Sequence, residues 1–180
     1  MKLIAQILIA LIIGAFGGVY LANFISLNNK NVTESKPSHT MPIRADIQGY
    51  AIVTDGDTIK INGTRIRFHG IDAPEMNQPC WRNDNQYQCG RAAKDYLTEL
   101  INNEPVICQY LSEDKYGRKI SKCYNHENQD IEAMMVSSGS AMAYLYYSKD
   151  YERQQEEARE ARIGIWAGRF EEPYQYRKNN

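Results

Sequence analysis

The chain has 180 residues, of which 43% are apolar, and this is enough for one compact domain with a core of its own plus appended segments. Its 21 basic and 22 acidic residues give a formal net charge of -1. This balance excludes a broadly basic surface that attracts nucleic acid by net charge, so a phosphodiester partner would require a local cluster of arginines.

The first 46 residues predict two appended segments. Residues 3–25, LIAQILIALIIGAFGGVYLANFI, contain no charged residue, and about 20 apolar residues suffice for a helix to cross a bilayer. Residues 1–26 are therefore predicted to be a signal peptide or a membrane anchor, and an uncleaved anchor is favoured because the small residues suited to cleavage fit the pattern poorly. Residues 27–46 are rich in Asn, Ser, Thr, Lys and Pro and predict a flexible linker. The rest of the chain is then exported: anchored in the inner membrane and facing the periplasm, or periplasmic or secreted after cleavage.

Residues 47–168 are predicted to form the globular domain, followed by a surface extension at 169–180. Alternating runs with β-branched residues predict five strands, at residues 49–55, 57–62, 64–71, 105–110 and 119–124. Apolar residues spaced three and four apart predict three helices, at residues 89–103, 130–139 and 148–164. Asp130 and Ser148 are the candidate N-caps of the last two. A helix between the third and fourth of five strands is the order of an OB-fold, so we predict an α+β domain built on a five-stranded antiparallel barrel.

Four cysteines lie in this domain, Cys80, Cys89, Cys108 and Cys123. An even count in an exported chain favours disulfides, and the order along the sequence suggests Cys80 with Cys89 and Cys108 with Cys123. Zinc binding is the alternative, but the spacing has no Cys-x-x-Cys pair. The second pair would join neighbouring antiparallel strands, on which facing residues lie within disulfide reach.

Two carboxylates are expected to meet at one end of the first three strands. Asp57 begins the second strand and Asp72 follows the third, and these strands are antiparallel neighbours joined by an Asn62-Gly63 turn at the other end. Two carboxylates with a backbone carbonyl form the all-oxygen site that Ca²⁺ prefers. Glu75 follows shortly after and could orient or deprotonate a water beside such a metal. A role in the Asp55-Gly56-Asp57 turn would explain Asp55 or Asp57 taken alone.

Arg67 and Arg118 are the candidate phosphate ligands. Arg67 lies five residues before Asp72, an odd spacing that places the two on opposite faces of a regular strand. A bulge at Gly70 would bring them to one face, and without it Arg67 would be a surface residue. Arg118 follows Gly117 in a predicted tight turn, where its guanidinium could fork onto a phosphate.

The motifs DGDTIKI, RFHGIDAPE, DKYGR, AYLY and GIW occur in this order. Their order and intervals resemble those of the staphylococcal nuclease, or thermonuclease, family, and the resemblance covers nearly all of residues 49–167. It implies an OB-fold enzyme that cuts DNA and RNA phosphodiesters with Ca²⁺. The loop after Glu75, which carries Cys80 and Cys89, departs from the best-known member of that family.

The resemblance also implies roles for particular residues. It implies calcium ligands in Asp57, Asp72 and the backbone carbonyl of Ala73, a position where the family often has threonine. It implies catalytic roles for Glu75, beside the attacking water, and for Arg67 and Arg118, on the scissile phosphate. It implies substrate contacts for Tyr144 and Tyr146, with Lys115 and Tyr116 as further phosphate-binding candidates. Core packing remains an alternative for part of the tyrosine-rich run around Tyr144.

These observations, taken with the resemblance, predict a monomeric, calcium-dependent nuclease that hydrolyses single-stranded DNA and RNA with little sequence preference. The resemblance also implies 3′-phosphate products. One alternative is a catalytically silent OB-fold module that binds nucleic acid. The other is an envelope-tethered protein that binds a protein or glycan and uses the acids as a structural calcium clip.

Overall fold

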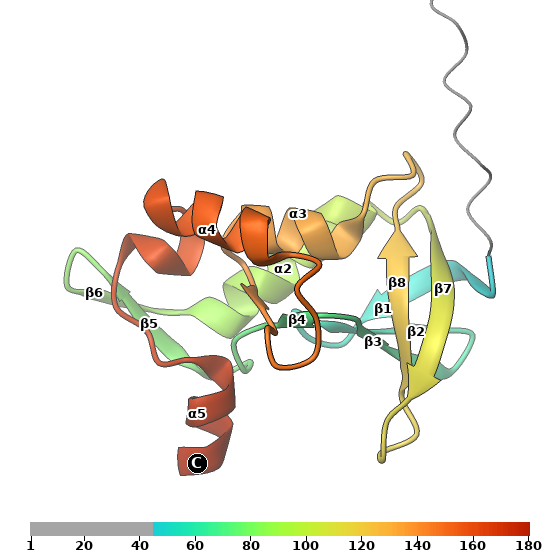
Figure 1. Ribbon diagram of the computed structural model, residues 1–180, viewed down its shortest axis with the longest axis horizontal. Helices are drawn as coiled ribbons and strands as arrows, with labels where there is room; N and C mark the ends of the chain where they lie inside the picture. Colours follow the sequence, from blue (N-terminus) through green and yellow to red (C-terminus); the bar gives the residue numbers. More distant parts are fainter. Residues whose placement is uncertain (1–44) are drawn as a thin grey trace, which may run out of the picture. The chain divides into compact units, whose positions relative to one another are not determined.

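The computed structural model describes residues 45–180, in which five strands close into a barrel with the order β1-β2-β3-β8-β7 (Figure 1). The barrel strands are β1 (Ile47–Val53), β2 (Thr58–Ile61), β3 (Thr64–Phe68), β7 (Pro105–Glu113) and β8 (Lys119–Tyr124). The helices of this part are α2 (Cys89–Ile101), α3 (Ile131–Ser137), α4 (Glu152–Glu160), α5 (Pro173–Asn179) and the short 3-10 helix η1 (Gly164–Ala167). Helix α3 packs against both α2 and α4. The predicted α+β barrel is confirmed, with one helix more than expected.

One strand pair corrects the antiparallel prediction. Strands β3 and β8 run parallel, with Ile66 opposite Lys119, whereas the other four neighbouring pairs of the barrel are antiparallel. Strand direction cannot alternate all the way round a closed ring of five, because five is an odd number. Barrel closure therefore requires a parallel pair that no local sequence pattern signals.

The barrel interior is filled by side chains at alternate strand positions, as the two-residue period of a strand requires. The fully buried ones on β2, β3 and β7 include Ile59, Ile61, Ile66, Phe68 and Val106. Helix α2 adds Ala93, Leu97 and Ile101, which are spaced four apart and so share one face. Burial of a side chain such as Phe68 contributes about 2 kcal/mol. This packing fixes β2 and β3, which carry the candidate site at their adjoining ends.

Both disulfides suggested by the sequence order are present, Cys80–Cys89 and Cys108–Cys123. Cys108 and Cys123 face each other on β7 and β8. Cys80 lies on a hairpin of β5 (Pro79–Arg82) and β6 (Asn85–Gln88), and Cys89 is the first residue of α2. The prediction of a loop after Glu75 is therefore wrong for residues 79–88, which form this hairpin. Its two-residue turn, residues 83–84, has positive φ at both positions, which Asn and Asp tolerate better than most residues.

The predicted helix caps have different outcomes. The Asp130 carboxylate accepts a hydrogen bond from the backbone N of Ala133 at 2.8 Å, which confirms Asp130 as the N-cap of α3. Ser148 does not cap α4, because that helix begins at Glu152. The Ser148 hydroxyl instead accepts from the backbone N of Asp150, a local turn that competes with helix formation.

The N-terminal predictions fall almost entirely outside the described residues, namely the signal peptide or anchor at 1–26 and the linker at 27–46 up to residue 44. In the part of the chain that the structure describes, no helix is both long enough and apolar enough to cross a bilayer.

Candidate active site

The structure brings Asp57, Arg67 and Asp72 together at one end of the barrel. Asp57 immediately precedes β2, and Asp72 ends β4 (Ile71–Asp72), which pairs with β9 (Met142–Ala143). Arg67, near the end of β3, bridges them: one nitrogen lies 2.7 Å from Asp57 Oδ1 and the other 2.9 Å from Asp72 Oδ1. The two predicted carboxylates therefore do meet, and one guanidinium joins them.

Gly70 allows Arg67 and Asp72 to share a face. Its φ of +71° lies in the left-handed region, and the chain turns there between the end of β3 and the start of β4. A Cβ added at Gly70 would lie 3.3 Å from the ring of Tyr151. A side chain would thus meet both backbone strain and crowding. The predicted bulge takes the form of a complete break in the strand.

The bridged group is buried. The side chains of Arg67, Asp57 and Asp72 are 16%, 7% and 4% exposed. Burial by itself lowers the pKa of Arg67, but the charges of Asp57 and Asp72 outweigh it and raise that pKa above its ordinary value. A third carboxylate lies close by, since the backbone N of Asp57 donates to Asp55 Oδ1 at 3.1 Å. Burial raises the pKa of Asp55 to about 6, and the charge of Asp57 adds to the shift.

The donor chemistry of the two aspartates fits a hard cation such as Ca²⁺. Each of their four oxygens accepts a hydrogen bond in this structure. Asp57 binds Arg67 through Oδ1 and the backbone N of Ala73 through Oδ2, and Asp72 binds Arg67 through Oδ1 and Arg177 through Oδ2. In residues 45–180, no group of three or more His, Cys, Asp or Glu side chains is arranged to hold a metal ion. Arginines hold three of these four oxygens, both of Asp72 and Oδ1 of Asp57, so a cation bound by both aspartates would compete with an arginine at Asp72.

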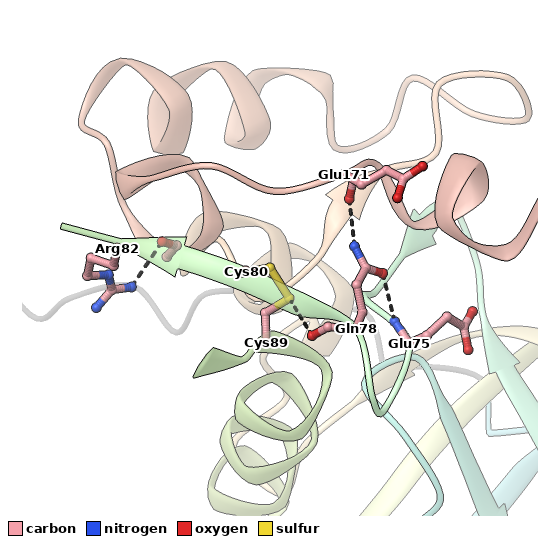
Figure 2. The surroundings of a disulfide bond; sticks show 7 residues. Glu75, Gln78, Cys80, Arg82, Cys89 and Glu171 are labelled. Carbon is pink, nitrogen blue, oxygen red and sulfur yellow. Dashed lines mark hydrogen bonds between the residues drawn. A yellow bond between two sulfur atoms is a disulfide. The ribbon is translucent and has the colours of Figure 1, made fainter. Parts of the chain in front are cut away.

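Glu75 lies next to this group and contacts the C-terminal helix α5. Its Oε1 accepts a hydrogen bond from Arg177 at 2.9 Å, and the other terminal nitrogen of Arg177 lies 2.9 Å from Asp72 Oδ2. The backbone N of Glu75 donates to Gln78 Oε1 at 3.1 Å (Figure 2). Burial by itself lowers the pKa of Arg177, but its hydrogen bonds to Asp72 and Glu75 raise it.

Arg118 lies apart from these residues in the turn between β7 and β8. Within residues 45–180, no hydrogen bond or ion pair joins Arg118 to the predicted carboxylates. Its Nε binds Asp114 Oδ2 at 2.7 Å, and its guanidinium lies 5.7 Å from the ring centre of Tyr116. Lys115 lies over the same ring at 5.0 Å. Arg118 directly precedes β8, the strand that pairs with β3, and in that pairing Lys119 lies opposite Ile66 and Ile120 opposite Arg67.

Tyr144 and Tyr146 line a pocket of about 590 Å³ that Asp72 also borders. Neither is buried, and Tyr146 is 84% exposed, whereas Tyr151 of the same tyrosine-rich run is in the core. The rings of Tyr144 and Tyr146 lie 6.4 Å apart. The C-terminal extension also lines this pocket, through Glu172, Pro173 and Tyr174.

The family model described as staphylococcal nuclease homologue matches residues 65–168. The chain belongs to the staphylococcal nuclease family. Its relatives include an uncharacterized endonuclease of Escherichia coli O157:H7, 33% identical over 68% of this chain and 79% of that protein. A micrococcal nuclease of Shigella flexneri is 31% identical over 77% of this chain and 85% of its own. The succinoglycan biosynthesis protein ExoI of Rhizobium meliloti is 31% identical over 72% and 69%.

Sequence reasoning missed Arg177, which lies beyond the segment that matches the staphylococcal nuclease family. It is 105 residues from Asp72 in the chain, and the tail that carries it shows no apolar period. Pro173 at the start of α5 is a helix-start signal that could have revealed the helix. No sequence pattern near Arg177 indicates which carboxylates its side chain would contact.

Proposed function

We propose that this chain is a calcium-dependent nuclease that hydrolyses DNA and RNA with little sequence preference. That it is a phosphodiester hydrolase rests on its membership of the staphylococcal nuclease family. The observation that carries the proposal is the buried bridge from Asp57 through Arg67 to Asp72. It combines, in one place, oxygen ligands for a hard cation with a guanidinium suited to phosphate.

The proposed mechanism divides the work among residues of three segments. Ca²⁺, when held by Asp57, Asp72 and the backbone carbonyl of Ala73, would supply charge stabilisation at the phosphate. Glu75 orients the attacking water and accepts its proton as the water oxygen bonds to phosphorus. The P–O5′ bond breaks, and the 5′-oxygen leaves and takes a proton from solvent, so the phosphate stays on the 3′ side. The two catalytic arginines, Arg67 and Arg118, fork onto the non-bridging oxygens, where negative charge develops in the transition state.

Substrate binding is assigned to aromatic and basic residues around this centre. Tyr144 and Tyr146 border the pocket next to Asp72, and exposed aromatic rings offer a stacking surface to any base. Lys115 and Tyr116 are assigned to the flanking phosphates. A base must leave its duplex stack to enter such a pocket, which supports single-stranded DNA and RNA as the preferred substrates. The near-neutral net charge also gives duplex DNA little overall attraction.

The disulfides indicate an extracellular or periplasmic location, because cytosolic proteins are kept reduced. We propose that residues 1–26 direct this export and then remain as an inner-membrane anchor, with the domain facing the periplasm. We also propose that the chain acts as a monomer, with all its site residues supplied by one copy.

The test uses the full chain, purified in detergent with its disulfides oxidised, and heat-denatured DNA as substrate. Release of acid-soluble nucleotides is measured with Ca²⁺, with EGTA, and for Glu75→Gln. We expect cleavage that EGTA abolishes and that falls at least a hundredfold in Glu75→Gln, because the variant cannot accept the proton. A folded wild type that retains denatured DNA on a filter without cleaving it would instead support the silent binding module.

A further inference from the structure

Arg177 connects the C-terminal helix α5 to two of the proposed active-site carboxylates. One of its terminal nitrogens lies 2.9 Å from Asp72 Oδ2 and the other 2.9 Å from Glu75 Oε1. The Asp72 side chain is only 4% exposed, whereas Arg177 is 35% exposed. A guanidinium from the surface thus reaches a buried carboxylate, and charge-assisted hydrogen bonds of this length are among the stronger ones in proteins.

The helix that carries Arg177 is tied to the loop that carries Glu75. The side chain of Gln78 is fully buried; its Nε2 donates to the backbone oxygen of Glu171 at 2.6 Å and its Oε1 accepts from the backbone N of Glu75 (Figure 2). Pro173, the first residue of α5, is also buried. Gln78 therefore links the segment that leads into α5 with the loop that carries Glu75. The same side chain thus helps to position both partners of the Arg177–Glu75 contact.

This arrangement leaves Asp72 without a vacant oxygen. Arg67 holds Oδ1 and Arg177 holds Oδ2. A divalent cation needs carboxylate oxygens close to it, and it also meets repulsion from a guanidinium at that distance. Arg177 and a cation therefore compete for Asp72. The same guanidinium also donates a hydrogen bond to Glu75, the residue to which we assign orientation of the attacking water.

We propose that Arg177 is a built-in competitor of the cation, which lowers the affinity of this site for Ca²⁺ and holds Glu75 until Ca²⁺ displaces it. This rests on the proposed function, because the cation whose binding is weakened is the one proposed there. The competitor belongs to the C-terminal extension, beyond residue 168, where the family match ends. Calcium affinity in this chain is accordingly set by a segment outside the nuclease motifs.

The experiment measures Ca²⁺ binding without substrate, by isothermal titration calorimetry on the full chain in detergent with oxidised disulfides. Arg177→Gln removes the competing charge and keeps a polar side chain. Lys178→Gln is the matched control, because it makes the same charge change on the next residue, which is exposed. We expect Arg177→Gln to bind Ca²⁺ at least tenfold more tightly than wild type, and Lys178→Gln to bind within twofold of it.

The outcomes separate this inference from the proposed function. Equal Kd values for wild type and Arg177→Gln would overturn the competitor role while leaving a calcium site in place. Absence of Ca²⁺ binding in both proteins would overturn the competitor role and the calcium dependence together. Binding by Arg177→Gln alone would support the competitor role in its strongest form.

A second variant keeps the experiment decisive if Arg177→Gln does not fold. Arg177→Lys keeps the charge, but an ammonium is a point donor without the planar fork that spans two carboxylates. We expect its Ca²⁺ affinity to lie between those of wild type and Arg177→Gln. An affinity no higher than that of wild type in Arg177→Lys, with Arg177→Gln unfolded, would count against the inference.

Discussion

The two arginines proposed to hold the scissile phosphate lie in contrasting surroundings. Arg67 belongs to a barrel strand and binds two buried carboxylates, Asp57 and Asp72. Arg118 belongs to a turn and binds a single partner, Asp114, four residues away in the chain. The first arginine is held by contacts that the whole barrel must form, and the second by contacts that the turn makes on its own.

This contrast suggests a division between stability and catalysis. A buried guanidinium between two carboxylates cannot be removed without leaving buried charge uncompensated, which costs far more than the loss of an exposed pair. A turn residue with a local partner can be replaced at little cost in folding. Substitution of Arg67 should therefore affect both stability and activity, whereas substitution of Arg118 should affect activity alone.

The largest effect is expected for Arg67→Met. Without Ca²⁺, loss of the bridge should lower the free energy of unfolding by about 3 kcal/mol, because the buried Asp57 loses its arginine and Asp72 keeps only Arg177. Activity with Ca²⁺ should fall by about a thousandfold, as for loss of a main donor to transition-state charge. Urea unfolding in EGTA and initial rates on denatured DNA measure the two. Arg65→Met is the control, since Arg65 is exposed on the same strand; an equal loss of stability there would break the contrast.

Arg118→Ala should produce a smaller and purely catalytic effect. Activity is expected to fall by about a hundredfold through loss of one phosphate donor. The free energy of unfolding should change by less than about 1 kcal/mol, because the Arg118–Asp114 pair is partly exposed and local. Urea unfolding in EGTA and initial rates on denatured DNA measure these two changes. A stability loss that matches that of Arg67→Met would show that the turn is as integral to the fold as the barrel strand.

The sequence predicted the part of the site at the ends of the barrel strands more fully than the parts that come from later segments of the chain. The convergence of Asp57 and Asp72 follows from one antiparallel pairing with a recognisable Asn62-Gly63 turn, and the register of β2 and β3 bears it out. The sequence also offered the irregularity at Gly70 as one of two alternatives, because Arg67 and Asp72 have an odd spacing and share a face only if the strand is interrupted. In each case the determining residues lie within about 15 positions of one another in the sequence.

The remaining features depend on contacts that no local pattern contains. The parallel pairing of β3 with β8 is imposed by closure of five strands, and it sets where the turn of Arg118 lies. Arg177 reaches Asp72 across more than half of the chain. Ser148 satisfied the composition of a helix cap, but its hydroxyl was taken by a competing turn. Sequence reasoning is strongest where one pairing decides the geometry and weakest where the whole fold must be known first.

Away from the site, Glu132 is a buried carboxylate without an arginine partner among the described residues, in contrast to Asp57 and Asp72. Glu132 is 0% exposed, and its carboxylate accepts hydrogen bonds from the backbone N of Cys123 at 3.0 and 3.1 Å. Asp57 and Asp72 each have an arginine, whereas the nearby charge that bears on Glu132 is that of Asp130, which repels it. Burial, with Asp130 adding to it, raises the pKa of Glu132 well above its ordinary value of 4.5.

This shift predicts a stability that depends on pH without any change in activity. The folded state holds the Glu132 proton to a higher pH than the unfolded state does, so the stabilisation is complete below pH 4.5 and is lost as the pH rises toward the folded pKa. One proton allows a slope of at most about 1.4 kcal/mol per pH unit. In Glu132→Gln, which cannot ionise, urea unfolding in EGTA should show a flatter dependence above pH 4.5, and the rate on denatured DNA should equal that of wild type. Parallel pH profiles in the two proteins would mean that Glu132 is ionised in the folded state, and that a buried carboxylate in this fold does not require an arginine to remain charged.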